Sequence, residues 1–386
     1  MSIRLTNPDD IHELVDQLRH AHVAYVDTEF HAERQYTPTL FLVQVHPAGG
    51  DIWLLDPLIE GLLESAADAL VSLPWVLHGG SQDMKLLHRE FGRLPDTILD
   101  TQIGAGLLSV DFPCGFGRLV HRFLGEQLQK SATLSDWSRR PLSDDQMKYA
   151  ADDVQYLPAL WSEIERQLEE RGRLEHARSA CADAKHEALA AFDADAAWRR
   201  IPGSGSLDPR QAAVLRELIL WREKTAQKRG QPPRSVLSDG IMRDLAKRQP
   251  TSTSELMSNR RLPRTVRHKL SNQLIELVCR GRAIPEAEQP SVIRNHSEQA
   301  ILTTWLQCFA QSNGQRLNLS SRLVLPLHLR ERIALAPPAT REDLGTLLGP
   351  WRNDILGDAL WGALRGAMAL GIQEGIVRPV SLHGFS

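Results

Sequence analysis

A chain of 386 residues is too long for one ordinary hydrophobic core, so we expect two or three domains. Its 42% hydrophobic and 24% charged residues are typical of a soluble globular protein, and its formal net charge is only −3. No stretch approaches the roughly 20 apolar residues of a membrane span, and the start, MSIRLTNPDD, lacks the regions of a secretory signal. These features argue against membrane and secreted classes, and we expect a cytoplasmic protein with no membrane partner.

The cysteines give no sign of a metal or redox site. No CxxC pair is present, and the four residues are widely spaced, at Cys114, Cys181, Cys279 and Cys308. Scattered cysteines in a chain of this length usually pack as small apolar residues in a reducing compartment. We expect that role for all four.

The net charge conceals a strong asymmetry along the chain. Residues 1–170 hold 13 Lys+Arg against 27 Asp+Glu, a net charge of −14, whereas residues 207–282 hold 17 against 7, a net charge of +10. Residues 293–372 hold 8 against 6, which gives only +2. Such a charge asymmetry is typical of a protein that binds a polyanion through its basic part. The acidic part would repel that polyanion unless metal ions neutralised some of its charge.

The first 170 residues alternate short β-rich runs with helical stretches, which predicts an α/β layer structure. Strand candidates lie at 23–27, 40–45, 51–56, 75–80 and 96–100. The first three are too close together for crossover helices and should form an antiparallel meander. The pattern then becomes strand, helix, strand, helix. A long helix from Ser143 to Glu170 closes this part, with Ser143 and Gln146 as a capping box.

The Pro/Gly/Ser cluster IPGSGSLDP, at 201–209, is the best candidate for a domain boundary. It ends a segment rich in alanine and charge, 171–206, and beyond it every strong pattern is helical. Residues 235–256 match residues 322–344 at an offset of 88. We therefore expect two copies of an all-α module of about 80 residues, at 207–284 and 293–375.

Four carboxylates and one tyrosine could form a metal site if the fold brings them together. Asp27 is expected to end an apolar strand, and the alternation of strand side chains sends Asp27 and Glu29 to one face. Asp83 follows a glycine turn at the start of a helix. Tyr149 and Asp153 lie four residues apart on the last helix, so both point from one of its faces. A cluster of this kind could hold two divalent ions, the usual equipment for in-line cleavage of phosphodiesters.

Each of these residues also has an ordinary structural explanation. Asp27 and Glu29 could be a solvated strand terminus, and Asp83 could complement the dipole of its helix. Tyr149 could be a core residue above a surface aspartate. Asp152 points about 100° away from its neighbour by helix geometry, and is therefore a less suitable ligand. Only the combination of all five residues favours a catalytic metal site over these structural explanations.

The order and surroundings of these residues resemble the DEDD exonucleases and, within them, the ribonuclease D family. The matching segments are VDTEF (26–30), HGGSQDMKLL (78–87), DTQIGAGLL (100–108) and LSDWSRRPLSDDQMKYAADDVQYLPALW (134–161). The two helical copies resemble the HRDC module, the first more closely than the second. The resemblance implies a ribonuclease H-like α/β exonuclease domain over 1–170, with a mixed sheet flanked by helices. A helical linker segment over 171–206 and two all-α HRDC-type domains, 207–284 and 293–375, would follow.

By this resemblance, the metal ligands are the four carboxylates Asp27, Glu29, Asp83 and Asp153. The two ions would be Mg²⁺ or Mn²⁺, which prefer oxygen ligands. One would activate a water for attack and the other would stabilise the departing 3′ oxygen, while Tyr149 would orient or deprotonate the water. The implied activity is 3′-to-5′ exoribonuclease, which releases nucleoside 5′-monophosphates from RNA with a free 3′ end. The implied substrates are tRNA precursors.

The first helical copy carries the basic residues expected to bind RNA. They form two groups: Lys224, Lys228, Arg229 and Arg234, then Arg260, Arg261, Arg264, Arg267 and Lys269. Phosphate contacts of this kind give affinity without sequence specificity and weaken with salt. A solvated basic face is the alternative. With its net charge of +2, the second copy is expected to be structural or guiding rather than a main RNA grip.

Two other functions remain open on the residues alone. The same carboxylates serve 3′–5′ DNA exonucleases, and no motif identifies contacts to a 2′-OH. A non-catalytic RNA-binding scaffold would use the acidic part only as an interaction surface. No GxxxxGK[ST] motif is present, so we expect no nucleotide cofactor and no helicase.

Overall fold

The computed structural model describes residues 3–5, 8–31, 35–128, 135–259, 261–293, 297–373 and 376–382. Leu134, in the last segment that resembles ribonuclease D, and Arg260, in the second basic group, lie outside these ranges. Within them, no helix is both long and apolar enough to cross a bilayer.

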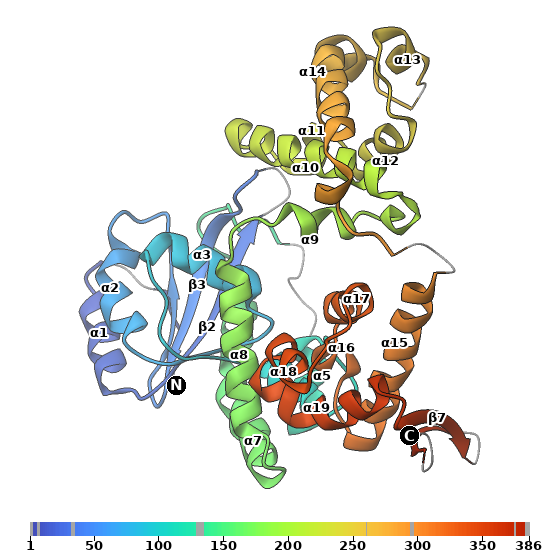
Figure 1. The fold of residues 1–386 in the computed structure, drawn as a ribbon. Helices are drawn as coiled ribbons and strands as arrows, with labels where there is room; N and C mark the ends of the chain where they lie inside the picture. Colours follow the sequence, from blue (N-terminus) through green and yellow to red (C-terminus); the bar gives the residue numbers. More distant parts are fainter. Residues whose placement is uncertain are drawn as a thin grey trace.

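Six strands form one mixed sheet in the first hundred residues (Figure 1). They are β1 (Ile3–Leu5), β2 (Ala24–His31), β3 (Thr39–Pro47), β4 (Ile52–Leu55), β5 (Trp75–Leu77) and β6 (Ile98–Asp100). The order across the sheet is β1-β4-β3-β2-β5-β6. The predicted meander is confirmed, because β2, β3 and β4 pair antiparallel, while the remaining neighbours are parallel. The sequence did not predict β1, a three-residue strand too short to show a periodic pattern.

Helices cover both faces of the sheet because strand side chains alternate between the faces. The first face carries α1 (Ile11–His20), α2 (Leu62–Val71) and α3 (Ser81–Phe91). The second carries α4 (Thr101–Gly106), α5 (Phe116–Leu124), α6 (Asp144–Gln155) and α7 (Leu157–Glu170). Val26 and Trp53 are buried on the first face, whereas their neighbours Tyr25 and Leu54 are buried on the second. We call these the α3 face and the α6 face.

Two predicted boundaries were wrong. Asp27 does not end its strand, because residues 27–31 continue to pair with β3. The predicted long helix is two helices, since α6 ends at Gln155 and α7 begins at Leu157. Pro158 in the first turn of α7 accounts for the break, because proline has no N–H to donate to the preceding turn.

The described chain beyond residue 170 is helical except for one hairpin and short connecting segments. Two helices, α8 (Leu174–Leu189) and α9 (Ala194–Arg199), occupy the predicted linker segment. The first repeat contains α10 (Pro209–Arg229), α11 (Pro233–Val236), α12 (Asp239–Arg248), α13 (Thr253–Ser258) and α14 (Arg264–Ala283). The second repeat contains α15 (Glu298–Leu317), α16 (Ser321–Val324), α17 (Leu327–Leu335), α18 (Arg341–Leu348) and α19 (Pro350–Leu364). The hairpin β7 (Met368–Gln373) and β8 (Ile376–Ser381) follows.

The internal repeat is present in the structure. The helices α11, α12 and α13 recur as α16, α17 and α18, and each begins 88 residues later, the offset found in the sequence. The domain boundaries at 170, 207, 284 and 293 stay predictions.

The two repeats meet the rest of the molecule in different ways (Figure 1). The first repeat has its own core, to which Leu218 and Leu245 belong. In the second repeat, buried residues such as Phe309 and Ile333 join the core on the α6 face of the sheet. Helix α8 contacts α3 and β6 and also α19, and so links the exonuclease-like part to the second repeat.

The cysteine prediction holds for two residues and is wrong for the other two. Cys114 and Cys181 are buried, whereas Cys279 on α14 and Cys308 on α15 are exposed. Each of these long helices turns its apolar stripe to a core, and the two exposed thiols lie off that stripe.

Candidate active site

Three of the four predicted metal carboxylates come together between β2 and α6. Asp27, Glu29 and Asp153 each offer an oxygen, and these atoms lie within 4.8 Å of one another. All three side chains are partly exposed, so solvent and a ligand can reach them. Carboxylates from residues 126 positions apart in sequence thus form one group.

The strand and helix periods explain this convergence. Asp27 and Glu29 share the side of β2 on which Tyr25 is buried, the α6 face. Helix α6 packs against β2, β3 and β4 on that face, and it carries Asp153 in its last turn. Asp152 points elsewhere and is not part of the group of three, as predicted.

Asp83 reaches the site from the opposite side of the sheet. It is buried in the first turn of α3, on the face where Thr28 points, because Thr28 alternates with its neighbours Asp27 and Glu29. The Thr28 hydroxyl donates a hydrogen bond to Asp83 Oδ1. The fourth carboxylate is therefore held by Thr28 and is not part of the group of three.

Burial and mutual repulsion both disfavour the charged forms of these carboxylates, so each holds its proton more tightly than an ordinary carboxylate. Burial, followed by the charges of Asp153 and Asp83, raises the pKa of Glu29 from 4.5 to about 8. Burial also raises the pKa of Asp153 to about 7, with a further contribution from Asp152. The pKa of Asp27 lies well above its usual value, first through burial and then through the charges of the other carboxylates. Carboxylates with raised pKa values favour the binding of positive charge beside them.

Tyr149 lies one turn before Asp153 on α6, close enough for its hydroxyl to interact with the Asp153 carboxylate. Burial, together with the nearby carboxylate charges, raises its pKa. The indole of Trp137 packs beside the phenol, with ring centroids 6.1 Å apart. Tyrosine and carboxylate therefore form one polar unit at the site, as their spacing predicted.

The segment before α6 is fixed by Arg140, to which the sequence analysis gave no separate role. Its guanidinium makes a two-pronged ion pair with Asp56, which follows β4, and donates to the carbonyl oxygens of Phe41 (2.7 Å) and Trp137 (2.9 Å). Three residues later, Ser143 caps α6 in the predicted capping box. Because α6 starts from this anchored segment, the positions of Tyr149 and Asp153 follow from it.

Asp100 is a second positioning residue that the sequence analysis did not single out. It caps α4, and its carboxylate accepts hydrogen bonds from the backbone N–H groups of Gly79 (3.0 Å), Gly80 (3.2 Å) and Gln102 (2.8 Å). Gly79 has a φ of +62°, which glycine adopts without strain. The turn that leads to Asp83 is thereby fixed by a buried carboxylate.

A sequence signal existed for each of these positioning residues. Arg140 and Asp100 both lie in the segments that resemble ribonuclease D, and Thr28 lies between two predicted ligands. Their partners are 84, 20 and 55 residues away. No local pattern links residues so far apart in sequence.

The predicted RNA-binding residues of the first repeat lie on three helices. Lys224, Lys228 and Arg229 are exposed near the end of α10, Arg234 is exposed on α11, and Arg264 and Lys269 are exposed on α14. Arg267 is half-buried and donates to the Met257 carbonyl oxygen. Exposed Arg261 precedes α14.

Comparison with known proteins places this architecture in a family. The sequence model of a 3′–5′ exonuclease family matches residues 3–169, and that of the HRDC domain matches residues 211–278. Ribonuclease D of Nitrobacter hamburgensis is 30% identical over 97% of this chain and 98% of its own length. The chain belongs to the ribonuclease D family. It is therefore an exoribonuclease with a 3′–5′ exonuclease domain.

Two further relatives support this assignment along nearly the whole chain. Ribonuclease D of Pseudomonas paraeruginosa is 33% identical over 89% of this chain and 92% of its own length. The crystal structure of Escherichia coli RNase D, an exoribonuclease involved in structured RNA processing, has a TM-score of 0.78 and 26% identity. The structural match covers 95% of this chain and 99% of the Escherichia coli chain. The resemblance stated from the motifs and the fold class predicted from it are confirmed.

Proposed function

We propose that the chain removes nucleotides from the 3′ end of RNA by metal-dependent hydrolysis and releases nucleoside 5′-monophosphates. The observation that carries this proposal is the group formed by Asp27, Glu29 and Asp153, whose oxygens lie within 4.8 Å of one another. A ribonuclease D fold around such a group supports metal-assisted phosphodiester cleavage over any chemistry that uses a nucleophilic side chain.

The residues present fit divalent cations of the Mg²⁺ or Mn²⁺ kind. Every donor in the group is a carboxylate oxygen, the ligand type that these ions prefer over the imidazole and thiolate that suit zinc. Burial, and after it the charges of neighbouring carboxylates, raises the pKa of both Glu29 and Asp153. Bound cations would remove that repulsion and hold the carboxylates in their charged forms.

We assign one ion to Asp27, Glu29 and Asp153, and a second to Asp27 and Asp83. Divalent ions bound there would lower the pKa of a coordinated water and stabilise the departing 3′ oxygen. Thr28 holds Asp83 toward the site through its hydroxyl, and Arg140 holds the start of the helix that presents Asp153. These contacts fix the carboxylates before substrate arrives.

The role assigned to Tyr149 is orientation of the attacking water. Its hydroxyl lies beside the Asp153 carboxylate, one turn along the same helix, where it can contact a water held at the site. A phenol with a raised pKa keeps its proton at neutral pH. Both properties favour an orienting group over a general base.

The first repeat would hold the RNA chain through its exposed basic residues. Six of them, on α10, α11 and α14, face solvent, and phosphate contacts from such residues add affinity that does not depend on sequence. The substrates we propose are tRNA precursors and other structured RNAs with a free 3′ end. The relative from Escherichia coli, which acts in structured RNA processing, supports this choice.

The test is a time course with 5′-labelled RNA and DNA of matched sequence in Mg²⁺, Mn²⁺ or EDTA. We expect stepwise shortening of RNA from its 3′ end with either ion and none in EDTA. Asp153→Asn should slow hydrolysis by at least about 10³-fold, which corresponds to about 4 kcal/mol. Asp145→Asn is the matched control, because it makes the same change on the exposed first turn of α6. Retained activity in the Asp153 variant would refute the site assignment, and faster cleavage of DNA would favour a DNA exonuclease.

A further inference from the structure

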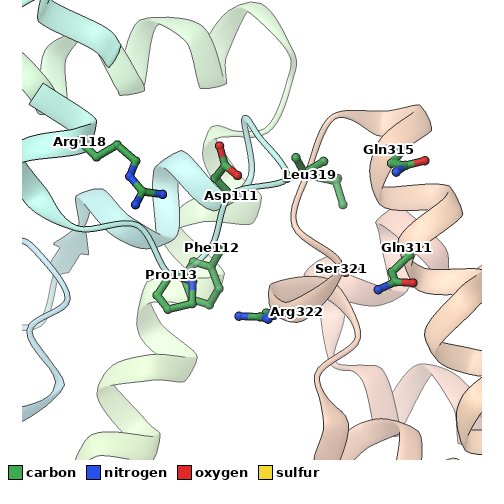
Figure 2. A pocket seen from close by; sticks show the side chains of 10 residues that line it. Asp111, Phe112, Pro113, Arg118, Gln311, Gln315, Leu319, Ser321 and Arg322 are labelled. Carbon is green, nitrogen blue, oxygen red and sulfur yellow. The ribbon is translucent and has the colours of Figure 1, made fainter. Parts of the chain in front are cut away.

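A polar cleft separates the exonuclease domain from the second repeat. One wall is the loop between α4 and α5 with the first turn of α5, and the other is α15 with the start of α16 (Figure 2). The cavity measures about 520 Å³, within the range of roughly 300 to 1,000 Å³ typical of ligand sites. Arg118 and Arg322 face each other across it, from positions 204 residues apart in sequence.

The two arginines carry free charge. Both are exposed, and within the described ranges neither has a carboxylate within ion-pair distance, unlike Arg140, Arg166 or Arg352. Asp111 also lines the cleft, but Arg122 lies 3.5 Å from its carboxylate and offsets its charge. The cleft is therefore positive in a domain whose net charge is strongly negative.

The other lining groups suit a nucleic-acid backbone. Gln311 and Gln315 project from one face of α15, and Ser321 adds a hydroxyl, so amide and hydroxyl donors accompany the guanidinium groups. Side chains of these types make most contacts to phosphate and sugar in nucleic-acid complexes. Phe112, which is half-exposed beside Pro113, offers a ring face on which an unpaired base can stack.

The walls are held together by contacts that do not involve the lining side chains. Ser320 N donates to the Gly106 carbonyl oxygen at 2.8 Å, and Arg173 donates both to Leu107 O (2.8 Å) and to Leu317 O (2.7 Å). Gly106 makes the close approach possible, because a Cβ there would lie 2.9 Å from Phe112 and 3.0 Å from Leu323. The cleft is thus preformed, which limits the entropy lost on binding.

The cleft wall is attached to the end of the sheet that carries the active site. Phe116, at the start of α5, packs on His78 with ring centroids 5.3 Å apart, and His78 directly precedes the glycine turn that leads to Asp83. Gln102 Nε2 donates to the Cys114 carbonyl oxygen at 3.0 Å. The cleft wall and the turn that leads to Asp83 are thus packed together.

We propose that this cleft is a second RNA-binding site, in which Arg118 and Arg322 bind the phosphodiester backbone of the substrate upstream of its 3′ end. This inference rests on the proposed function and assigns the second repeat a direct role in substrate binding. It differs from the expectation, based on a net charge of +2, that this repeat is structural or guiding rather than a main RNA-binding element. The number of charges matters less than where two of them are placed.

The test compares Arg118→Gln/Arg322→Gln with the parent protein in two measurements. In the first, binding of a fluorescent single-stranded RNA of about 16 nucleotides is followed by anisotropy over a series of salt concentrations in EDTA. We expect about three- to tenfold weaker binding at low salt, and a salt slope smaller by about 1.4, because two phosphate contacts on single strands are lost. Exposed arginines can be replaced without unfolding, and a thermal melt checks this.

In the second measurement, kcat/KM for the same RNA is divided by kcat/KM for a dinucleotide, which is too short to reach the cleft. The ratio should fall by about three- to tenfold in the double variant. Arg332→Gln is the matched control, since Arg332 is also exposed on the second repeat but lies outside the cleft, and it should leave both measurements unchanged.

An unchanged salt slope and an unchanged ratio would overturn the cleft assignment. Loss in the Arg332 variant equal to that in the double variant would overturn it too, because general charge would then explain the effect. These outcomes differ from failure of the proposed function, in which the parent protein would not hydrolyse RNA with any metal. The anisotropy measurement remains decisive for the cleft in that case.

Discussion

The two helical repeats have the same helix pattern but differ in how they join the nuclease. The first repeat packs around its own core and meets the exonuclease domain through Tyr36, whose hydroxyl donates to Glu223 at 2.5 Å and whose N–H donates to the Gly230 carbonyl oxygen at 3.1 Å. The second repeat shares the core of the α6 face. The first repeat has many surface charges and few contacts with the nuclease. The second repeat has extensive apolar contacts with the nuclease and fewer charges.

Substrate affinity and structural support can thus be divided between two copies of one fold. Basic residues on a repeat with a separate core can change without disturbing the catalytic residues. Apolar residues of the second repeat cannot, because they share a core with the face that presents Asp153. Three predictions follow from this contrast, and each can break it.

The largest expected effect comes from deleting a buried side chain in each repeat. Phe309→Ala should lower the free energy of unfolding by about 3–5 kcal/mol, and Leu245→Ala by about 2–5 kcal/mol, because both side chains are fully packed. Only the Phe309 variant should lose dinucleotide hydrolysis at a lower temperature, since its cavity lies in the shared core. Residual activity after heating, measured beside thermal unfolding, checks this. Equal loss of activity in the Leu245 variant would show that the two cores are not independent.

A smaller effect on stability is expected from a change of pH, and it should arise only in the exonuclease domain. The pKa of Glu29 is about 8 in the folded protein against 4.5 for an ordinary glutamate, so the folded state binds this proton more tightly than the unfolded state. Metal-free protein should therefore lose stability as pH rises from about 4.5 to about 8. Melting temperatures in EDTA and in Mg²⁺, at pH 5.5 and about 8.5, should show a larger gain from Mg²⁺ at the higher pH. Asp153→Asn should flatten this pH dependence, and an unchanged slope in that variant would contradict the prediction.

The smallest effect is expected at the link between the first repeat and Tyr36, which precedes β3. Tyr36→Phe removes the hydrogen bond to Glu223, which is worth about 1 kcal/mol at a partly exposed site. We expect a severalfold fall in kcat/KM for long RNA and little change for a dinucleotide, because only long RNA needs the first repeat held in place. Tyr156→Phe is the matched control, since Tyr156 lies between α6 and α7 of the nuclease and, within the described ranges, its hydroxyl makes no hydrogen bond to the first repeat. Equal falls for both substrates would mean that Tyr36 acts on the fold rather than on the link.

Much of the site could be predicted because each ligand follows a local period. Because side chains alternate along β2, Asp27 and Glu29 were predicted to share a face. The four-residue spacing on α6 likewise predicted that Tyr149 and Asp153 share a face of that helix. The structure confirms that three of these carboxylates meet. The capping box at Ser143 was predictable for the same reason, since it lies within four residues of sequence.

The remaining features could not be predicted because they depend on which helix or strand lies on which face of the sheet. Asp83 comes from the opposite side of the sheet and reaches the site through Thr28, a relation set by the path of the chain between β5 and α3. The anchoring of Arg140 by Asp56 depends on β4 ending next to the segment before α6. The shared core of the second repeat escaped prediction because counting charges says nothing about where a repeat docks.

The shared core also makes the exonuclease domain depend on the last part of the chain to complete its packing. Buried residues of the α6 face range from Val23 to Ala363, so contacts that complete this face join segments more than 300 positions apart. A nascent chain that has emerged only as far as the catalytic helix would still expose apolar surface at Gly106 and its neighbours. Such long-range contacts form late in folding. Packing of the α6 face is therefore complete only once the second repeat has been synthesised.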